Sequence, residues 1–263
     1  MRLYFELAKK AAQRQLAYRQ ANLAGLATNL FFGALRAYVL IALYGLRPEI
    51  AGYTLTAAIT YTALTQASGR ALQLFGWQEL VKTIRSGEIA SDLSKPFDYY
   101  FFWLAQDWGT NLIHLVMRGA PIVLAYALVT PLVWPTDPGM ALAFAASYLL
   151  AMLLSFAWRF CLNIIALWTI DSWGFVRLGF TFAWLLTGFL VPVTFFPPWL
   201  QTLAFLTPFP SMLETPVQIW LGILSGPKVF PAMMQQVIWL GALMILGRLM
   251  LAAGTRKLVV QGG

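Results

Sequence analysis

Charged residues, cysteine and histidine are scarce in this chain. Only 11% of its 263 residues are charged, whereas 60% are hydrophobic. A soluble globular domain has about 25% charged residues, so the composition excludes that class. The single cysteine, Cys161, excludes an internal disulfide. Because the chain also has only one histidine, His114, we expect no zinc or haem site in it.

Motifs for nucleotide binding and catalysis are missing as well. The chain lacks the phosphate-cradling sequence G-x-x-x-x-G-K-[ST] and contains no Gly-Lys pair. No nucleophiles, acids and metal ligands converge in its apolar runs, so we expect no catalytic residues, no metal and no cofactor. The net charge is +8, but the basic residues cluster at the ends of apolar runs rather than on one face. We therefore expect no nucleic-acid partner.

Long hydrophobic runs dominate what is present. A transmembrane helix needs about 20 predominantly apolar residues. Six runs reach this length, at residues 23–45, 53–75, 110–133, 139–168, 173–191 and 231–254. The sequence therefore predicts an all-α integral membrane protein, with six transmembrane helices in a single domain that covers residues 1–263.

Lysine and arginine are distributed unevenly between the two sides of these runs. Most lie in the N-terminal segment, in the loop after the second run, in the turn after the fourth run, and at the C-terminal end. Only Arg47 and Lys228 lie on the other side. Because basic loops stay in the cytoplasm, we expect a multi-pass protein of the inner or plasma membrane with both termini in the cytoplasm.

The N-terminal residues 1–21 are predicted to form an amphipathic helix that lies on the membrane surface. At 100° per residue, one face carries Tyr4, Leu7, Ala8, Ala11 and Tyr18. The opposite face carries Arg2, Glu6, Lys9 and Lys10. The alternative is a basic leader that is simply solvated.

Several arginines lie inside the predicted spans, and no Asp or Glu lies in any span to pair with them. Arg36 and Arg118 are well inside the first and third spans. A charge at the bilayer centre costs about 2.5–3.5 kcal/mol, so Arg36 needs a polar environment. One interpretation is that it lines a path and attracts an anionic group. The alternative is that Arg36 extends to the outer headgroups. Arg70, Arg159 and Arg248 lie near cytoplasmic ends of spans and are expected to extend to the headgroups there.

Two further spans contribute to the predicted path. The second span is rich in hydroxyl side chains, which suits either helix packing or a pore wall. The fifth span is aromatic. We take Arg36, Thr65, Gln66 and Trp184 as the candidate lining of a substrate path.

Residues 76–109, between the second and third spans, contain a compact charged stretch, RSGEIASDLSKPFDYY. A helix with Leu80, Val81 and Ile84 on one face is expected to end at Gly87. A second short helix follows, with Ile89 and Leu93 on its apolar side and Glu88 and Asp92 on its acidic side. It stops before Pro96, because the residue before proline is pushed out of the helical region. We expect these two helices to form a short, rigid element in the cytoplasm. The alternative is a loop that only caps the two spans.

Residues 191–230 are apolar but broken by proline. Six prolines lie between positions 192 and 216, and a proline inside a helix costs about 3 kcal/mol or more. A continuous span is therefore excluded. We expect re-entrant or external short helices, one of them Trp199–Leu206. The alternative is an ordinary folded outer loop.

Two stretches carry a resemblance to a known family. IRSGEIASDLSKPFDYYFF and FFPPWLQTLAFLTPFPSMLETPVQIWLG resemble, in order and spacing, the patterns of the six-helix permease subunits of ATP-binding-cassette (ABC) exporters, the ABC type-2 class. The resemblance covers nearly the whole chain.

The resemblance implies an assembly of two permease subunits, identical or different, with two cytosolic ATPases that bind the ATP. It also implies substrate passage between the permeases and a coupling helix in the charged stretch. On that basis, the residues that would couple the chain to the ATPase are Arg85, Glu88, Ile89, Asp92 and Leu93. The implied function is that of the transmembrane subunit of an ABC exporter.

Two other classes remain open at this stage. An ion-coupled secondary transporter usually places carboxylates near the membrane midplane, but all ten acidic residues are expected at span ends or in loops. A membrane-embedded enzyme would need a cluster of reactive groups that the spans do not supply. The sequence leaves the substrate open among drugs, lipids, peptides and glycans.

Overall fold

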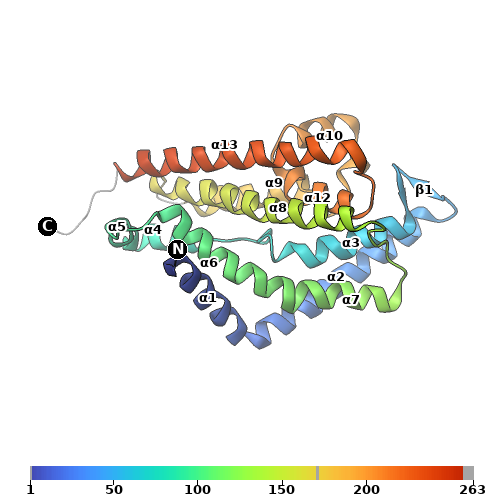
Figure 1. The fold of residues 1–263 in the computed structure, drawn as a ribbon, viewed down its shortest axis with the longest axis horizontal. Helices are drawn as coiled ribbons and strands as arrows, with labels where there is room; N and C mark the ends of the chain where they lie inside the picture. The colour runs from blue at the N-terminus through green and yellow to red at the C-terminus, as the bar shows by residue number, and fades with distance from the viewer. Residues whose placement is uncertain (1, 170–171, 257–263) are drawn as a thin grey trace.

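The computed structural model describes residues 2–169 and 172–256, and these form an elongated helical bundle (Figure 1). The first half contains α1 (Arg2–Ala17), α2 (Arg19–Tyr44), strands β1 (Glu49–Ile50) and β2 (Tyr53–Thr54), α3 (Leu55–Gly69), α4 (Glu79–Arg85), α5 (Glu88–Leu93), α6 (Tyr99–His114), the π-helical turn η1 (Leu115–Gly119) and α7 (Ala120–Val129). The second half contains α8 (Pro138–Ile164), η2 (Ile165–Leu167), α9 (Trp173–Leu186), η3 (Val193–Phe195), α10 (Pro198–Phe205), α11 (Phe209–Met212), α12 (Glu214–Trp220), η4 (Gly226–Lys228) and α13 (Val229–Thr255).

The prediction of an all-α membrane protein is confirmed, but six continuous spans are not. Within the described residues, four helices are long and apolar enough to cross a membrane: Arg19–Tyr44, Tyr99–Val129, Pro138–Leu167 and Gly226–Thr255. They correspond to the predicted first, third, fourth and sixth spans. In place of the second and fifth spans lie α3, with 15 residues, and α9, with 14. At 1.5 Å per residue each is about 22 Å long, short of a hydrocarbon core of about 30 Å.

Local backbone geometry explains why these two helices are short. After α3 the chain turns into an irregular segment, residues 70–78, in which Gln73 and Gly76 have positive φ angles of 54° and 123°. After α9 the chain reverses at Gly188, whose φ is +80°, and prolines follow from Pro192 onward. A left-handed residue cannot continue an α-helix, so both apolar runs lose their helical form before they end.

The third long helix begins earlier than the sequence suggests. Asp98 caps α6 by accepting a hydrogen bond from the backbone N–H of Phe101 at 3.0 Å, so the helix starts at Tyr99 rather than at residue 110. The last part of the predicted segment 76–109 therefore belongs to α6, and only the residues up to about 98 lie outside that helix. The π-helical turn η1 precedes Pro121, which lacks a backbone N–H and crowds the carbonyl four residues earlier. The wider turn accommodates that proline within a continuous helix.

Helix α1 packs along α6, and the expected two-faced pattern of α1 is present. Ala11 is buried, and the hydroxyl of Tyr4 accepts a hydrogen bond from the backbone N–H of Asp98 at 3.3 Å. The crossing is tight, because a Cβ atom on Gly109 would lie 1.9 Å from the carbonyl oxygen of Ala8. Tyr18 differs from the expectation: it is exposed and marks the break between α1 and α2.

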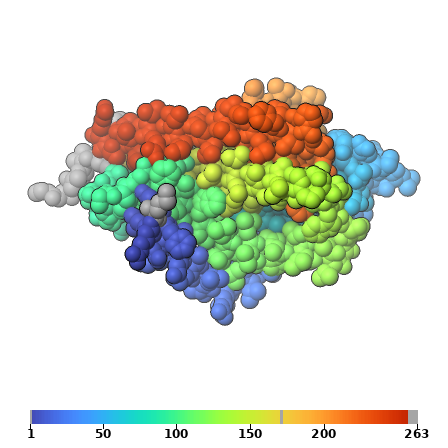
Figure 2. Space-filling view, in the orientation of Figure 1, coloured from blue at the N-terminus to red at the C-terminus, as the bar shows by residue number. Residues whose placement is uncertain are grey.

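The largest apolar core joins both halves of the chain. Aromatic rings from α6 and α8 form its centre, where Tyr100 meets Phe156 and Phe160 with ring centroids 5.1 and 5.0 Å apart. The same core includes Ile89 of α5 and Leu243 of α13. Helices α13 and α8 run side by side along one face of the molecule, as the space-filling view shows (Figure 2). Helices α4 and α5 lie at the end of the bundle opposite the β1 hairpin (Figure 1).

The proline-rich segment forms the expected short helices, α10, α11 and α12. Helix α10 begins at Pro198 and nearly matches the predicted Trp199–Leu206. Most residues of α11 and α12 are buried within the chain, against α8 and α3. Their backbone breaks are thus covered by protein, as broken backbone in a membrane protein requires.

Candidate functional site

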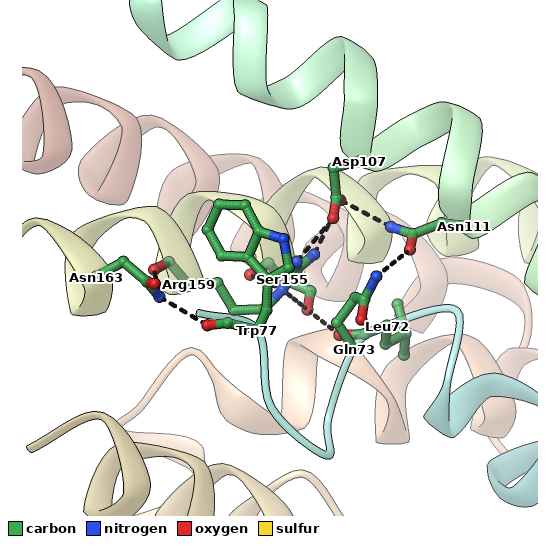
Figure 3. A network of polar contacts seen from close by, with 8 residues as sticks. All are labelled: Leu72, Gln73, Trp77, Asp107, Asn111, Ser155, Arg159 and Asn163. Atoms are coloured by element: carbon green, nitrogen blue, oxygen red, sulfur yellow. Dashed lines mark hydrogen bonds and ion pairs between the residues drawn. The ribbon is translucent and has the colours of Figure 1, made fainter. Parts of the chain in front are cut away.

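A buried ion pair joins α6 and α8 (Figure 3). The guanidinium of Arg159, from α8, donates two hydrogen bonds to the carboxylate of Asp107, from α6, at 2.8 and 2.9 Å. Their side chains are 0% and 1% exposed. Arg159 therefore does not extend to the headgroups, and that prediction is wrong. Asp107 also corrects the premise that every acidic residue lies at a span end or in a loop.

The ion pair anchors the irregular segment 70–78 (Figure 3). Asn111 donates to Asp107 at 2.7 Å and accepts from the side-chain amide of Gln73 at 3.0 Å. Side chains of α8 bind the backbone of the segment, with Ser155 donating to the carbonyl of Leu72 at 2.7 Å and Asn163 to that of Trp77 at 3.0 Å. Helices α6 and α8 thus satisfy polar groups that a regular helix would have satisfied internally.

Beside this segment lies a cavity of about 530 Å³, called the arginine cavity below. It is bounded by α2, the end of α3, segment 70–78, η1, the end of α9 and the chain after it. Three arginines line it: Arg36, Arg70 and Arg118. The other lining residues are Gly25, Thr28, Asn29, Phe32, Gln66, Phe75, Trp184, Phe189 and Leu190, and none of them is acidic.

Backbone carbonyls and amides, rather than carboxylates, hold two of these arginines. Arg36 donates to the carbonyl of Phe189 at 2.7 Å, and its guanidinium lies 4.4 Å from the centre of the Phe189 ring. Arg118 donates to the side chain of Asn22 at 3.2 Å and to the carbonyl of Ala21 at 2.9 Å. Arg36 thus points into the protein, unlike the alternative in which it extends to the outer headgroups.

Three of the four predicted path residues meet at the arginine cavity: Arg36, Gln66 and Trp184. Thr65 does not line it, because its side chain is fully buried and donates to the carbonyl of Thr62 at 3.0 Å. The prediction missed Arg70 as a lining residue. Its position just after the last polar residues of α3 was the available signal, but the turn that directs it inward is not visible in the sequence.

The predicted coupling residues lie at one end of the bundle, in α4 and α5. Gly87 has a φ of +78° and separates the two helices, as predicted. Arg85 and Glu88 are exposed, and Asp92 forms an ion pair with Lys95 at 2.7 Å. The apolar side faces inward, since Ile89 is 0% exposed and Leu93 packs on the core of this chain. Ile89 therefore anchors α5 to the core and offers no surface to a partner.

A second buried carboxyl group, Glu214, was not predicted at all. It lies at the start of α12, outside the four candidate spans, and is 1% exposed. The hydroxyls of Tyr61 and Tyr53, the amide of Gln218 and the backbone N–H of Val193 all donate to it, the last two at 2.7 and 3.1 Å. The hydroxyl of Tyr61 also lies 2.6 Å from the carbonyl oxygen of Gly188, so this cluster ties α3 to the turn after α9.

The Glu214 cluster predicts a pH dependence of stability. Burial raises the pKa of Glu214 to about 7, although its hydrogen bonds act in the opposite direction. The unfolded chain has a glutamate pKa of about 4.3, so the folded state binds the proton more tightly. Stability contributed by this group is present at acid pH and is lost as pH rises from about 4.5 to about 7, by roughly 3 kcal/mol.

The test is the melting temperature of wild type and Glu214→Gln between pH 4.5 and 8. We expect the difference between the two proteins to change by several degrees across the window and to become constant above it. Because the other groups that face Glu214 are tyrosine hydroxyls and amides, they stay protonated throughout. Parallel pH profiles for the two proteins would contradict the assignment.

Long apolar helices with a buried ion pair between them define a multi-pass membrane protein. Over residues 30–262, the chain matches the model of the family described as ABC-2 family transporter protein, and it belongs to that family. The resemblance to ABC type-2 permeases is thereby confirmed, and such a permease is a transmembrane component without an ATPase site of its own. The chain has no match among curated proteins and none among solved structures.

Proposed function

We propose that the chain is the transmembrane subunit of an ABC exporter that passes its substrate along the arginine cavity. A separate cytosolic ATPase supplies the energy and binds the ATP. A second permease subunit, identical or related, completes the path. The family membership supports the general role, and the arrangement of α4 and α5 is the observation that carries the coupling to an ATPase.

Helices α4 and α5 have the properties of a coupling element. Their inner faces are fixed to the core through Leu80, Val81 and Ile89, each 0% exposed. Their outer surface offers Arg85 and Glu88. A short element that is rigidly attached to the bundle and charged at its tip can pass a movement of a bound partner on to the other helices. A flexible loop would change shape instead. We therefore propose that this end of the bundle faces the ATPase in the cytoplasm.

The remaining assignments follow from that orientation. The N-terminal end of α1 lies near α4 and α5 (Figure 1). We therefore assign the basic N-terminal segment to the cytoplasmic side as well. In a bacterial cell this would be the inner membrane. The alternative, an ion-coupled carrier, could use the buried Glu214, but transport by such a carrier would not require ATP.

The coupling is tested by reversing two charges, Glu88→Lys together with Asp92→Lys. We expect the amount of ATPase that co-purifies with the permease to fall about tenfold, because two acidic contacts become repulsive. Reversing Asp92 also removes its ion pair with Lys95, an exposed contact that contributes little to stability. The measurement is the ratio of the two subunits after affinity purification, together with ATP-dependent transport in vesicles.

Glu49→Lys is the matched control, since Glu49 is exposed on β1 at the other end of the bundle (Figure 1). It should leave the subunit ratio unchanged. If the double reversal retains the ATPase and transports at the wild-type rate, α5 is not the coupling element. Transport that continues without any ATPase would favour the ion-coupled alternative.

A further inference from the structure

The three arginines of the arginine cavity have no acidic partner among the described residues. The described residues form four salt bridges, and the two arginines among their members are Arg159 and Arg248, neither of which lines the cavity. Arg36 and Arg118 are bound by carbonyl and amide oxygens, which orient a guanidinium without neutralising it. The Nε atom of Arg70 is buried and has no hydrogen-bond partner in the described part of the chain. The cavity therefore holds positive charge that an anion could compensate.

The fixed geometry of these side chains suits recognition of an anionic group. Arg118 lies on the π-helical turn η1, and π-helical turns occur frequently at functional sites. Its guanidinium rests against Gly25 of α2, where a Cβ atom would lie only 2.2 Å from Nη1. Guanidinium groups bind carboxylate and phosphate through paired hydrogen bonds. Three of them around one space can hold a carboxylate, phosphate or sulfate.

The rest of the cavity wall is aromatic and apolar. Phe32, Phe75, Trp184 and Phe189 line it, and the Trp184 and Phe189 rings stack with centroids 5.9 Å apart. Phe32 and Phe75 are 53% and 49% exposed, so the cavity reaches the outer surface of the bundle beside α2. A free inorganic anion would gain nothing from these walls, whereas a hydrocarbon chain attached to the anion would bury apolar surface against them.

A second cavity of about 500 Å³ adjoins the first and shares Arg70 and Phe75 with it. Arg14 of α1 and Lys82 of α4 line this second cavity, so basic side chains continue from the α4 end of the bundle to Arg36. Its two acidic side chains are already paired, Asp107 with Arg159 and Glu79 with Lys82. An anionic headgroup therefore meets unpaired arginines along this route.

From these observations we infer the substrate class: an anionic amphiphile, whose headgroup is bound by Arg36, Arg70 and Arg118 and whose apolar chain lies against the aromatic wall. This inference rests on the proposed function, because it takes the arginine cavity as the substrate path.

The test is binding to the purified full-length chain, read by native mass spectrometry from neutral detergent. The probes are phosphatidylglycerol, phosphatidylcholine and soluble glycerol 3-phosphate, which separate a lipid headgroup from a free phosphate. We expect phosphatidylglycerol to be retained about tenfold more strongly than either of the others. Arg70→Gln should reduce its binding about tenfold, as the loss of a charge-assisted contact predicts. Because the Arg70 side chain makes no hydrogen bond among the described residues and its backbone carbonyl keeps the bond from the N–H of Gln73, this variant should fold normally.

Arg36→Gln is the second variant, and the exposed Arg47→Gln is the control that should bind like wild type. The inference is overturned if Arg70→Gln and Arg36→Gln both retain phosphatidylglycerol at the wild-type level. Equal binding of phosphatidylcholine, or of soluble glycerol phosphate, also overturns it. No ATPase is present in this experiment, and the subunit-ratio measurement of the charge reversal uses no lipid probe, so each proposal can fail without the other.

Discussion

Replacing Asp107 with asparagine is expected to destabilise the folded chain by about 3–5 kcal/mol. The substitution leaves the guanidinium of Arg159 charged, 0% exposed and without its counter-ion. The other partners of the guanidinium, the backbone carbonyl and the hydroxyl of Ser155 at 3.1 and 3.4 Å, can accept a hydrogen bond but cannot neutralise the charge. Asparagine offers one acceptor oxygen where aspartate offers two, so Arg159 and Asn111 would compete for it. The link through Asn111 to Gln73 of the irregular segment should weaken as a result. Chemical denaturation in micelles measures the effect as a lower unfolding midpoint.

A matched double variant separates the ion pair from mere packing. In Asp107→Leu with Arg159→Met both charges are removed together, and hydrophobic replacement of a buried pair is often neutral or stabilising. We expect this variant to recover most of the stability that Asp107→Asn loses. If the double variant is as unstable as the single one, the buried charge of Arg159 is not the cause of the loss.

Gly109→Ala and Gly241→Ala are expected to change stability in opposite directions, although both add one methyl group inside a helix. At Gly109 the new Cβ atom would lie 1.9 Å from the carbonyl oxygen of Ala8, and 2.7 Å from its carbonyl carbon. Backbone atoms cannot rotate away, so α1 must separate from α6, at a cost of about 1–3 kcal/mol or more. At Gly241 of α13 no atom lies within 4 Å, and alanine should stabilise the helix by about 0.5–1 kcal/mol.

Limited trypsin digestion reports the position of α1 directly. Arg14 and Arg19 flank the break at Tyr18, and a displaced α1 should expose this junction to cleavage. We expect Gly109→Ala to be cleaved there several-fold faster than wild type, and Gly241→Ala to be cleaved at the wild-type rate. Equal cleavage rates for all three proteins would show that α1 does not depend on the close crossing.

Much of the fold could be predicted because it depends on local patterns. Apolar runs marked the four long helices to within a few residues at most ends, and glycine and proline marked the α4–α5 pair and the short helices after Pro192. The start of α6 was missed because Gln106 and Asp107 make that turn look polar, whereas tertiary contacts bury Asp107. The lengths of α3 and α9 were missed because a positive φ angle at Gln73 is rare outside glycine and has no sequence signal.

The candidate site was predictable only where a residue was anomalous by itself. Arg36 stood out because it lies deep in an apolar run, and Trp184 and Gln66 lay in runs of unusual composition. The sequence does not show which polar residues pair in the fold. Asp107 and Arg159 are 52 positions apart, and Glu214 and Tyr61 are 153 apart. A charged residue in an apolar run indicates that a partner is needed, but the packing of the helices determines which residue that partner is. For that reason Arg159 was assigned to the headgroups and Arg70 was omitted from the path.

The attachment of segment 70–78 to two different helices has a consequence for how the arginine cavity can widen. The carbonyls of Leu72 and Trp77 are bound from α8, whereas Gln73 is bound from α6. Gradual sliding of α6 along α8 would strain these bonds. Leu72 and Gln73 are 0% and 4% exposed, so a broken hydrogen bond would leave a buried polar group without a partner. We therefore expect the segment to rearrange by exchanging one complete set of partners for another. Widening of the arginine cavity at Phe75 would then be a switch between two states rather than continuous flexing.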